Sequence, residues 1–318
     1  MSPSLGTRDI SYLNAGQLEM TLSYRFLHSD DIYIGTDEQP QVKAAGREPR
    51  LDVNSFDLSV RYGITRRFSA TVTVPFIHST ASVVHPDGTR RSGGPGAQLG
   101  DLRVQGSVWL LDPPTHPNGN VAVSLGVKIP SANEASTGNV FTPSGPVKKP
   151  IDISQQPGDG GWAILLEGQW FQKVFKNTVA YAAGFYLFNP RNTNGVEPPQ
   201  SNATNQFFMS VPDQYSARAG LTLPVWAGRG ISLNLGGRVD GLPVTDVFGS
   251  SDGFRRPGYV VFFEPGVTWS PGKNTFNFSA PIAVSRSIQT SVLDESRNVR
   301  TGGGLADFLI LAGYSRRF

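Results

Sequence analysis

Polar and apolar residues alternate strictly in the first extended segment, from Gln17 to Phe26. Leucine, methionine, tyrosine and phenylalanine occupy one set of alternate positions, and polar or charged residues occupy the other. Successive side chains of a β-strand point to opposite faces, so a period of two gives the strand one apolar and one polar face. The same alternation runs from 55 to 64 and from 68 to 76, with only residues 65–67 between the two runs. These two runs predict an antiparallel hairpin.

The alternation continues along the chain and predicts about twelve strands, near residues 17–27, 54–64, 68–77, 101–111, 120–129, 162–171, 178–188, 213–225, 231–240, 258–269, 274–285 and 305–318. The pattern is weaker in the sixth and seventh strands, where four large apolar residues fall on the polar side: Leu165, Phe171, Tyr186 and Phe188. Short and long connections alternate along the chain. The long ones are expected near 28–53, 78–100, 130–161, 189–212, 241–257 and 286–304.

Strands of about ten residues in even number, with short turns at one rim and long loops at the other, are typical of bacterial outer-membrane barrels. The strands of a soluble sandwich or propeller also alternate between apolar and polar residues. In those folds, however, nothing requires short and long loops to alternate along the chain. We therefore predict an all-β fold: a transmembrane antiparallel up-and-down β-barrel of about 12 strands. Residues 1–318 are expected to form one domain, with 1–16 as a short N-terminal segment.

Aromatic residues gather at the strand ends, where the two membrane interfaces are expected. They include Tyr24, Phe56 and Phe76 at the long-loop rim and Phe68, Trp170 and Trp269 at the short-turn rim. The last strand ends in Phe318, in phase with Tyr314 and Phe308. This ending resembles the C-terminal signal by which outer-membrane barrels engage their assembly machinery, so we expect that machinery to be a partner.

The composition narrows the alternatives. The sequence has no cysteine, which excludes disulfides and thiolate metal sites, and 36 glycines and 24 prolines, which favour turns over long helices. The net charge of +3 arises from 28 basic and 25 acidic residues scattered along the chain, so no nucleic-acid surface is expected. No apolar run approaches the roughly 18 residues of a membrane-spanning helix. The N-terminus has no basic region followed by an apolar one, so either the protein is not exported or its signal peptide has been removed. For an outer-membrane barrel we expect the second.

Three short segments resemble a known family. They are the run from Ser11 to Glu19 before the first strand, Leu99-Gly100-Asp101-Leu102 at the start of the fourth, and the run from Leu125 to Pro130 at the end of the fifth. Together they resemble the outer-membrane channel family associated with the meta-cleavage pathway of phenol degradation. The resemblance implies a porin-like barrel that passes small, often aromatic or hydrophobic, compounds. It carries over no substrate-binding residues.

In such a barrel the polar face lines the lumen. The candidate lumen and constriction residues are Arg25, Asp57, Arg61, Arg103, Lys128, Glu167, Arg218, Arg238 and Glu264. We expect the first hairpin to place Arg25 opposite Asp57.

Two later hairpins are expected to oppose like charges, Arg103 to Lys128 and Arg218 to Arg238. Like charges directly opposite each other are destabilising. Each pair therefore needs either neighbouring carboxylates, from Asp101, Glu167, Asp240 or Glu264, or an anion at a constriction.

The connection 130–161 is rich in proline, glycine and serine and is the candidate gate, with Lys148 and Lys149 as its charges. The alternative is a loop exposed at the cell surface. The acidic residues of the first long loop, Asp30, Asp31, Asp37 and Glu38, lack the spacing of a calcium-binding loop, so we expect a solvated loop and no metal site.

The four histidines show no triad arrangement, and no Gly-x-Ser-x-Gly turn precedes a helix, so we expect neither catalysis nor a cofactor. Twelve strands leave a narrow or loop-plugged lumen. The sequence therefore predicts a passive channel for small molecules in the outer membrane of a Gram-negative bacterium, in contact with membrane lipids and lipopolysaccharide. The alternatives are a membrane-embedded enzyme acting on lipid, and a non-conducting barrel whose loops bind a partner or assemble.

Overall fold

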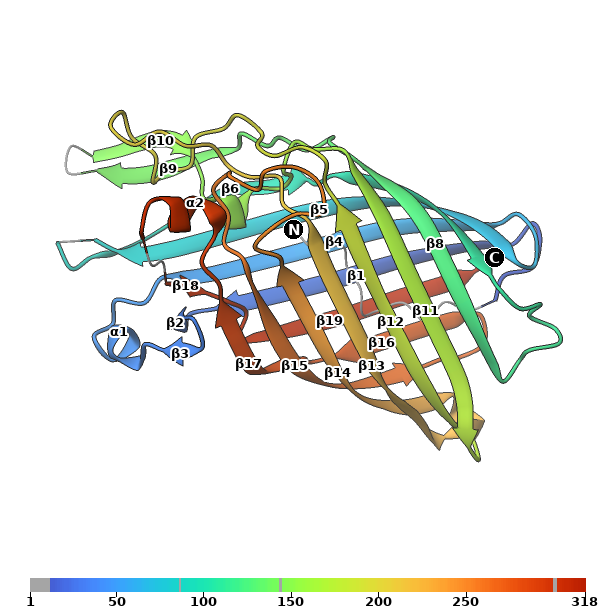
Figure 1. The fold of residues 1–318 in the computed structure, drawn as a ribbon. Helices are drawn as coiled ribbons and strands as arrows, with labels where there is room; N and C mark the ends of the chain where they lie inside the picture. The colour runs from blue at the N-terminus through green and yellow to red at the C-terminus, as the bar shows by residue number, and fades with distance from the viewer. Residues whose placement is uncertain (1–11, 86, 143–144, 300–301) are drawn as a thin grey trace.

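The computed structural model describes residues 12–85, 87–142, 145–299 and 302–318. One antiparallel sheet closes on itself as a barrel, in which the first strand pairs with the last from Glu19 opposite Arg317 to His28 opposite Phe308 (Figure 1). Along the wall the strands are β1 (Leu18–Ser29), β4 (Arg50–Gly63), β5 (Phe68–Val84), β6 (Arg90–Leu99) with β7 (Leu102–Trp109), β8 (Gly119–Ile129), β11 (Ala163–Phe175), β12 (Thr178–Phe188), β13 (Gln214–Trp226), β14 (Ile231–Leu242), β15 (Gly258–Trp269), β16 (Asn274–Ser279) with β17 (Ile282–Ile288), and β19 (Phe308–Arg317).

Two of the wall strands are interrupted. β6 and β7 both pair with β5, and β16 and β17 both pair with β15, so each couple acts as one strand and the barrel has twelve. The first interruption lies at Gly100, where a Cβ atom would come within 2.9 Å of the Pro75 and Ile77 side chains. The second lies at Pro281, which has no N–H to give to a neighbouring strand. The predicted fold class and strand number are confirmed.

The burial pattern is inverted relative to a soluble protein. Inward-facing polar side chains such as Thr71, Ser124 and Glu19 are buried, whereas outward-facing Phe56 and Leu125 are 45% and 63% exposed. An apolar outer surface with a polar interior is the arrangement of a membrane-spanning barrel. Among the described residues, no helix is long and apolar enough to cross a bilayer.

The long connections contain short elements. The first has β2 (Ile32–Ile34), β3 (Asp37–Glu38) and α1 (Pro40–Ala44), and the third has a hairpin of β9 (Thr137–Thr142) and β10 (Gly145–Pro150) followed by the 3-10 turn η1 (Ile153–Gln155). A second 3-10 turn, η2 (Ala227–Arg229), lies at the short-turn rim, and α2 (Val292–Ser296) and β18 (Gly303–Gly304) complete the long-loop end (Figure 1).

The connection expected at 78–100 is largely strand. β5 runs on to Val84 and β6 begins at Arg90, so a two-stranded hairpin extends beyond the barrel rim (Figure 1). This part of the chain has no period of two because β6 contains Gly93, Gly94 and Gly96, which have no side chain to mark a face.

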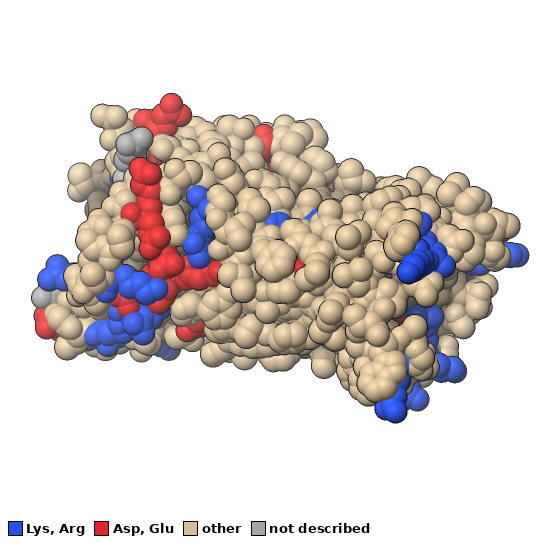
Figure 2. Space-filling view, turned by 90° about the horizontal axis from the view of Figure 1, so that it is seen from below, with Lys and Arg blue, Asp and Glu red and all other residues tan. Residues whose placement is uncertain are grey.

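The two rims differ in charge. At the short-turn rim seven lysines and arginines are exposed, and none of them forms an ion pair with another described residue: Arg66, Arg67, Lys173, Lys176, Arg229, Lys273 and Arg316. Figure 2 shows basic side chains gathered at this end, on the right, and acidic and basic side chains mixed at the long-loop end, on the left.

Candidate functional site

A layer of charged side chains crosses the lumen, held mostly in ion pairs. β1 and β4 pair with Glu19 opposite Arg61 and Arg25 opposite Ser55, so the expected pairing of Arg25 with Asp57 is wrong by two residues. The pattern could not reveal this, because a shift of two residues leaves every side chain on the same face. Arg61 lies 3.8 Å from the Glu19 carboxylate.

The two cationic oppositions predicted from the sequence are present. Arg103 is opposite Lys128, and each forms an ion pair with a carboxylate. The Arg103 guanidinium lies 2.5 Å from Asp57, and Lys128 Nζ lies 3.5 Å from Asp101. Lys128 also donates a hydrogen bond to Asp159, a loop residue that was not among the predicted lumen residues.

Arg218 is opposite Arg238. Arg238 Nε lies 2.9 Å from both carboxylate oxygens of Asp240, and Arg218 lies 4.0 Å from Glu264. Carboxylates of the chain therefore lie beside both cationic pairs, as in the first of the two predicted arrangements. Glu167 is not among them, because it accepts hydrogen bonds from Gln169 and Gln105 instead.

A cavity of about 250 Å³ lies inside the barrel, lined by β1, β4, β13, β14, β15 and β19 together with four of the long loops. Most of its wall is apolar, formed by Leu27, Leu51, Val53, Ile153, Met209, Pro212, Leu242, Val260, Phe262, Leu305, Ala306 and Leu309. Its polar members include Arg25, Asp159, Gln214, Asp240 and Arg256.

The part of the predicted gate that folds inward is residues 151–161, because five of the lining residues are Ile153, Ser154, Gln156, Gly158 and Asp159. Ser79 Oγ of β5 donates to the Gln155 carbonyl at 2.9 Å, which holds this segment against the wall. Lys148 and Lys149 are exposed on the β9–β10 hairpin, which projects from the rim (Figure 1), and neither lines the cavity. Composition alone could not show which half of the loop would turn inward.

Asp152 anchors the inward segment. Its carboxylate accepts hydrogen bonds from Ser154 N at 3.0 Å, from Gln200 Nε2 at 2.8 Å and from Arg256 Nη2 at 2.7 Å. Burial raises the pKa of this carboxyl, but the Arg256 charge and the hydrogen bonds outweigh that effect and lower the pKa to about 2. The anchor is therefore ionised at neutral pH.

At the short-turn mouth, Tyr12 lies against inward-facing residues. Its ring centroid is 4.8 Å from that of Trp109 and 6.0 Å from that of Phe171, and its hydroxyl donates to the His116 carbonyl at 2.8 Å. Asn120 Nδ2 donates to the same hydroxyl. Aromatic pairs at these separations are favourable beyond the area they bury. Tyr12 thus narrows the lumen at this end.

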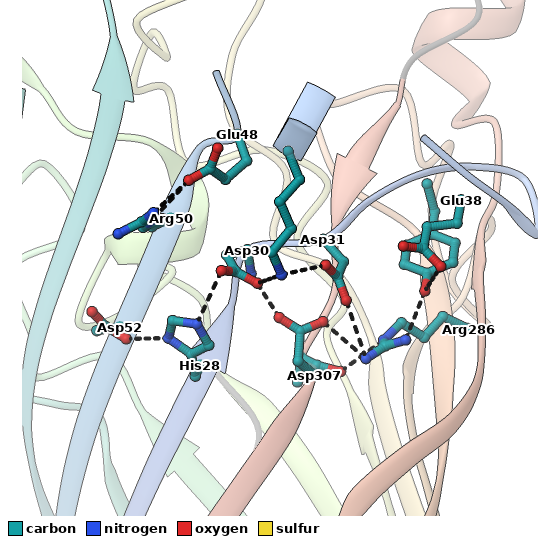
Figure 3. Close-up of polar contacts among 12 residues, drawn as sticks. His28, Asp30, Asp31, Glu38, Glu48, Arg50, Asp52, Arg286 and Asp307 are labelled. Carbon is teal, nitrogen blue, oxygen red and sulfur yellow. Dashed lines mark hydrogen bonds and ion pairs between the residues drawn. The ribbon is translucent and has the colours of Figure 1, made fainter. Parts of the chain in front are cut away.

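A second charged cluster lies at the long-loop rim (Figure 3). Lys43 Nζ lies 2.7 Å from Asp30 and 2.8 Å from Asp31, and Arg286 lies 2.9 Å from Asp307. The expectation of a solvated acidic loop is thus wrong for Asp30 and Asp31, which are half-buried and paired, and holds for the exposed Asp37 and Glu38.

Asp307 and His28 belong to the same cluster. One ligand atom each from His28, Asp30 and Asp307 lie within 4.8 Å of one another, but Lys43 and Arg286 already compensate the carboxylates. Burial and the nearby Asp31 and Asp30 raise the pKa of Asp307 to about 6, against the lowering effect of Arg286 and of the Asp30 N–H. The cluster joins the first long loop to the closing seam of the barrel.

No family model matches the chain, and no curated protein sequence matches it. Among solved structures it is similar to the COG4313 outer membrane channel from Pseudomonas putida F1, with 14% identity, a TM-score of 0.63, and coverage of 99% of this chain and 100% of that one. It is also similar to the translocator domain of autotransporter NalP from Neisseria meningitidis, with 11% identity, coverage of 96% and 90%, and a TM-score of 0.48. A mutant of the TodX monoaromatic hydrocarbon channel gives 10% identity, coverage of 96% and 91%, and a TM-score of 0.49.

The first of these likenesses shows the fold. The chain has the twelve-stranded barrel of an outer-membrane channel, and the resemblance stated from the sequence is confirmed at that level.

Proposed function

We propose that this protein is a passive outer-membrane channel for small hydrophobic or aromatic molecules. The observation that carries the proposal is the apolar cavity of about 250 Å³ inside a closed barrel. Small-molecule sites are concave and mostly apolar, with a few placed polar groups. The similar structure from Pseudomonas putida F1 is itself described as an outer membrane channel, which supports the same class of function.

We place the long loops outside the cell and the short turns in the periplasm, as in other barrels of this kind. The seven exposed bases of the short-turn rim then lie beside phospholipid headgroups, next to interfacial aromatics. Arg229 lies 4.7 Å from the Trp226 ring and Arg316 lies 5.3 Å from the Phe318 ring, as suits a cation and an amphipathic ring at a membrane surface. Phe318 remains the proposed contact with the assembly machinery, and lipopolysaccharide the proposed neighbour of the long loops.

We propose residues 151–161 as the gate, in place of the lysine pair. This segment forms part of the cavity wall and is held by a small set of polar contacts, of which the Asp152–Arg256 ion pair is the strongest. Loop motions of this size occur without unfolding a barrel. No chemical step is assigned to the protein, and selectivity comes from the cavity wall and the charged layer.

Uptake by proteoliposomes tests the proposal. Vesicles containing the folded protein should take up benzyl alcohol and similar single-ring compounds faster than protein-free vesicles, and planar bilayers should show small discrete conductances. Folding is checked by heat-modifiable migration on detergent gels. Rates equal to those of protein-free vesicles, from protein that passes the gel test, would refute the channel function.

A further inference from the structure

We infer that the cavity binds small single-ring carboxylates, with the carboxylate held by Arg25 and the ring held by the apolar wall. This inference rests on the proposed channel function and names a class of permeant for it. Four features carry it: the state of Arg25, the charges around it, a second unpartnered polar group, and the size of the apolar space.

Arg25 is buried and has no polar partner among the described residues. It lies on the inward face of β1, between Ser55 of β4 and Leu311 of β19, and is only 6% exposed. Its guanidinium forms no hydrogen bond and no ion pair with any described residue, and Nε is buried without an acceptor. The residue lines the cavity. Burying a charge in this way is costly unless an opposite charge compensates it.

The nearby carboxylates are already engaged. Asp240 and Asp57 attract Arg25 electrostatically. However, both carboxylate oxygens of Asp240 accept hydrogen bonds from Arg238 Nε, and Asp57 accepts a hydrogen bond from Arg103.

The other charges lining the cavity are also matched. Asp159 accepts a hydrogen bond from Lys128, and Arg256 is paired with Asp152. Arg25 is therefore the charged side chain lining the cavity that has no hydrogen-bonded or ion-paired partner among the described residues, and an anionic ligand would supply one.

Gln214 is the second unpartnered group. It lines the same cavity from β13 and is 2% exposed, and no described residue donates a hydrogen bond to its buried Oε1. An amide presents both a donor and an acceptor. Oε1 needs a donor, which a hydroxyl on the ligand ring would supply and an ionised carboxylate would not. A pure hydrocarbon would leave both Gln214 and Arg25 without partners among the described residues.

The apolar wall favours a ring over an inorganic anion. Leu27, Val53, Val260, Phe262 and Leu309 lie around Arg25 on the inward faces of neighbouring strands or across the same cavity. A cavity of roughly 150 Å³ is known to hold benzene, so the 250 Å³ available here accommodates a ring with a carboxylate attached. Chloride or sulfate would match the charge and leave the apolar wall in contact with water.

Binding measured calorimetrically on the folded protein in detergent tests the inference, at neutral pH where benzoate is an anion. Benzoate is compared with benzyl alcohol, its neutral counterpart, and with sulfate. The test variant is Arg25→Met, which removes the charge and keeps an apolar side chain of similar length. The control is Lys148→Gln with Lys149→Gln, which removes positive charge from the exposed hairpin and leaves the cavity intact.

We expect benzoate to bind the wild type about tenfold or more tightly than benzyl alcohol, because a hydrogen bond to a charged group is worth roughly that factor. Arg25→Met should lose that advantage, while benzyl alcohol binds within about twofold of wild type. The lysine control should bind benzoate as the wild type does. Replacing an unpaired buried charge by an apolar side chain should not impair folding, which the gel shift verifies.

Three results would overturn the inference: equal binding of benzoate and benzyl alcohol by the wild type, unchanged benzoate affinity in Arg25→Met, or sulfate competing as well as benzoate, which would indicate a general anion site. The channel function is judged separately. If vesicles take up benzyl alcohol and benzoate does not bind, the inference fails and the channel stands; if benzoate binds and vesicles take up nothing, the channel fails.

Discussion

The Asp152–Arg256 ion pair should control how often residues 151–161 leave the lumen. The substitution Asp152→Asn removes the charge and keeps the shape of the side chain. Lowering the pKa of Asp152 from its ordinary value near 4 to about 2 corresponds to about 2 to 3 kcal/mol of stabilisation. Because the Arg256 side chain is 34% exposed, solvent screening reduces this to about 1 to 2 kcal/mol.

That free energy is equivalent to a factor of roughly 5 to 30 in the ratio of open to closed gate. Single-channel recording at neutral pH measures the ratio as the fraction of time spent in the conducting state. Asp152→Asn should raise it by that factor at unchanged single-channel current. A matched control is Asp87→Asn, which removes a carboxylate paired with Arg91 at 2.5 Å in the β5–β6 hairpin, away from the cavity. The control should record as the wild type does.

The same ion pair sets a pH dependence. A carboxyl group with a lowered pKa in the folded state stabilises that state above its unfolded pKa, near 4, and the stabilisation is lost as the pH falls toward 2. The open fraction of the wild type should therefore rise between about pH 4 and pH 2, while that of Asp152→Asn changes less. Identical open fractions for the two proteins at neutral pH would refute the assignment of Asp152 as the anchor of the gate.

Three further outcomes follow from the geometry. Tyr12→Ala should widen the short-turn mouth and increase single-channel conductance, and conductance equal to wild type would show that Tyr12 does not narrow the path. Asp240→Asn leaves the buried Arg238 guanidinium without its carboxylate and should destabilise the barrel by about 3 to 5 kcal/mol, measured by thermal unfolding in detergent; an unchanged midpoint contradicts this. Because the folded pKa of Asp307 is raised to about 6, above an unfolded value near 4, thermal stability should increase as pH falls from 6 to 4. Asp307→Asn should flatten that dependence, and an equally steep curve would exclude Asp307 as its source.

The barrel wall could be predicted because lipid imposes one rule on every strand. A residue that faces lipid must be apolar, and the next residue along the strand faces the lumen. The period of two can therefore be recognised in β1 and β4 even when the strands they pair with are not known. The register of these strands could not be predicted, since the connection 30–49 is too long to fix it and a slip of two residues keeps both faces. The oppositions across the shorter connections, such as Arg103 with Lys128, were predicted correctly because a short connection leaves few possible registers.

The cavity was missed, although the sequence contains a trace of it. Near the long-loop rim several strands carry consecutive apolar residues, as in Val260-Val261-Phe262-Phe263 and Phe308-Leu309-Ile310-Leu311, so both faces are apolar there. One face of each run meets lipid and the other lines the cavity or packs beside it. The inward turn of 151–161 and the contribution of Met209 depend on contacts between distant loops, which local pattern does not encode.

Arg25 lies where the inner face of the barrel changes character. Along β1 the inward residues run from Glu19, Thr21 and Ser23 through Arg25 to Leu27, and along β19 they run from Arg317 and Ser315 through Gly313 to Leu311 and Leu309. The lumen wall is thus polar toward the short turns and apolar toward the long loops along these two strands, with the Arg25 guanidinium at the boundary. A ring carboxylate entering from outside would place its ring in the apolar half and its charge at Arg25, ahead of the charged layer. A neutral ring would find no partner at that boundary, so the position of Arg25, more than the size of the cavity, should decide which single-ring compounds are held.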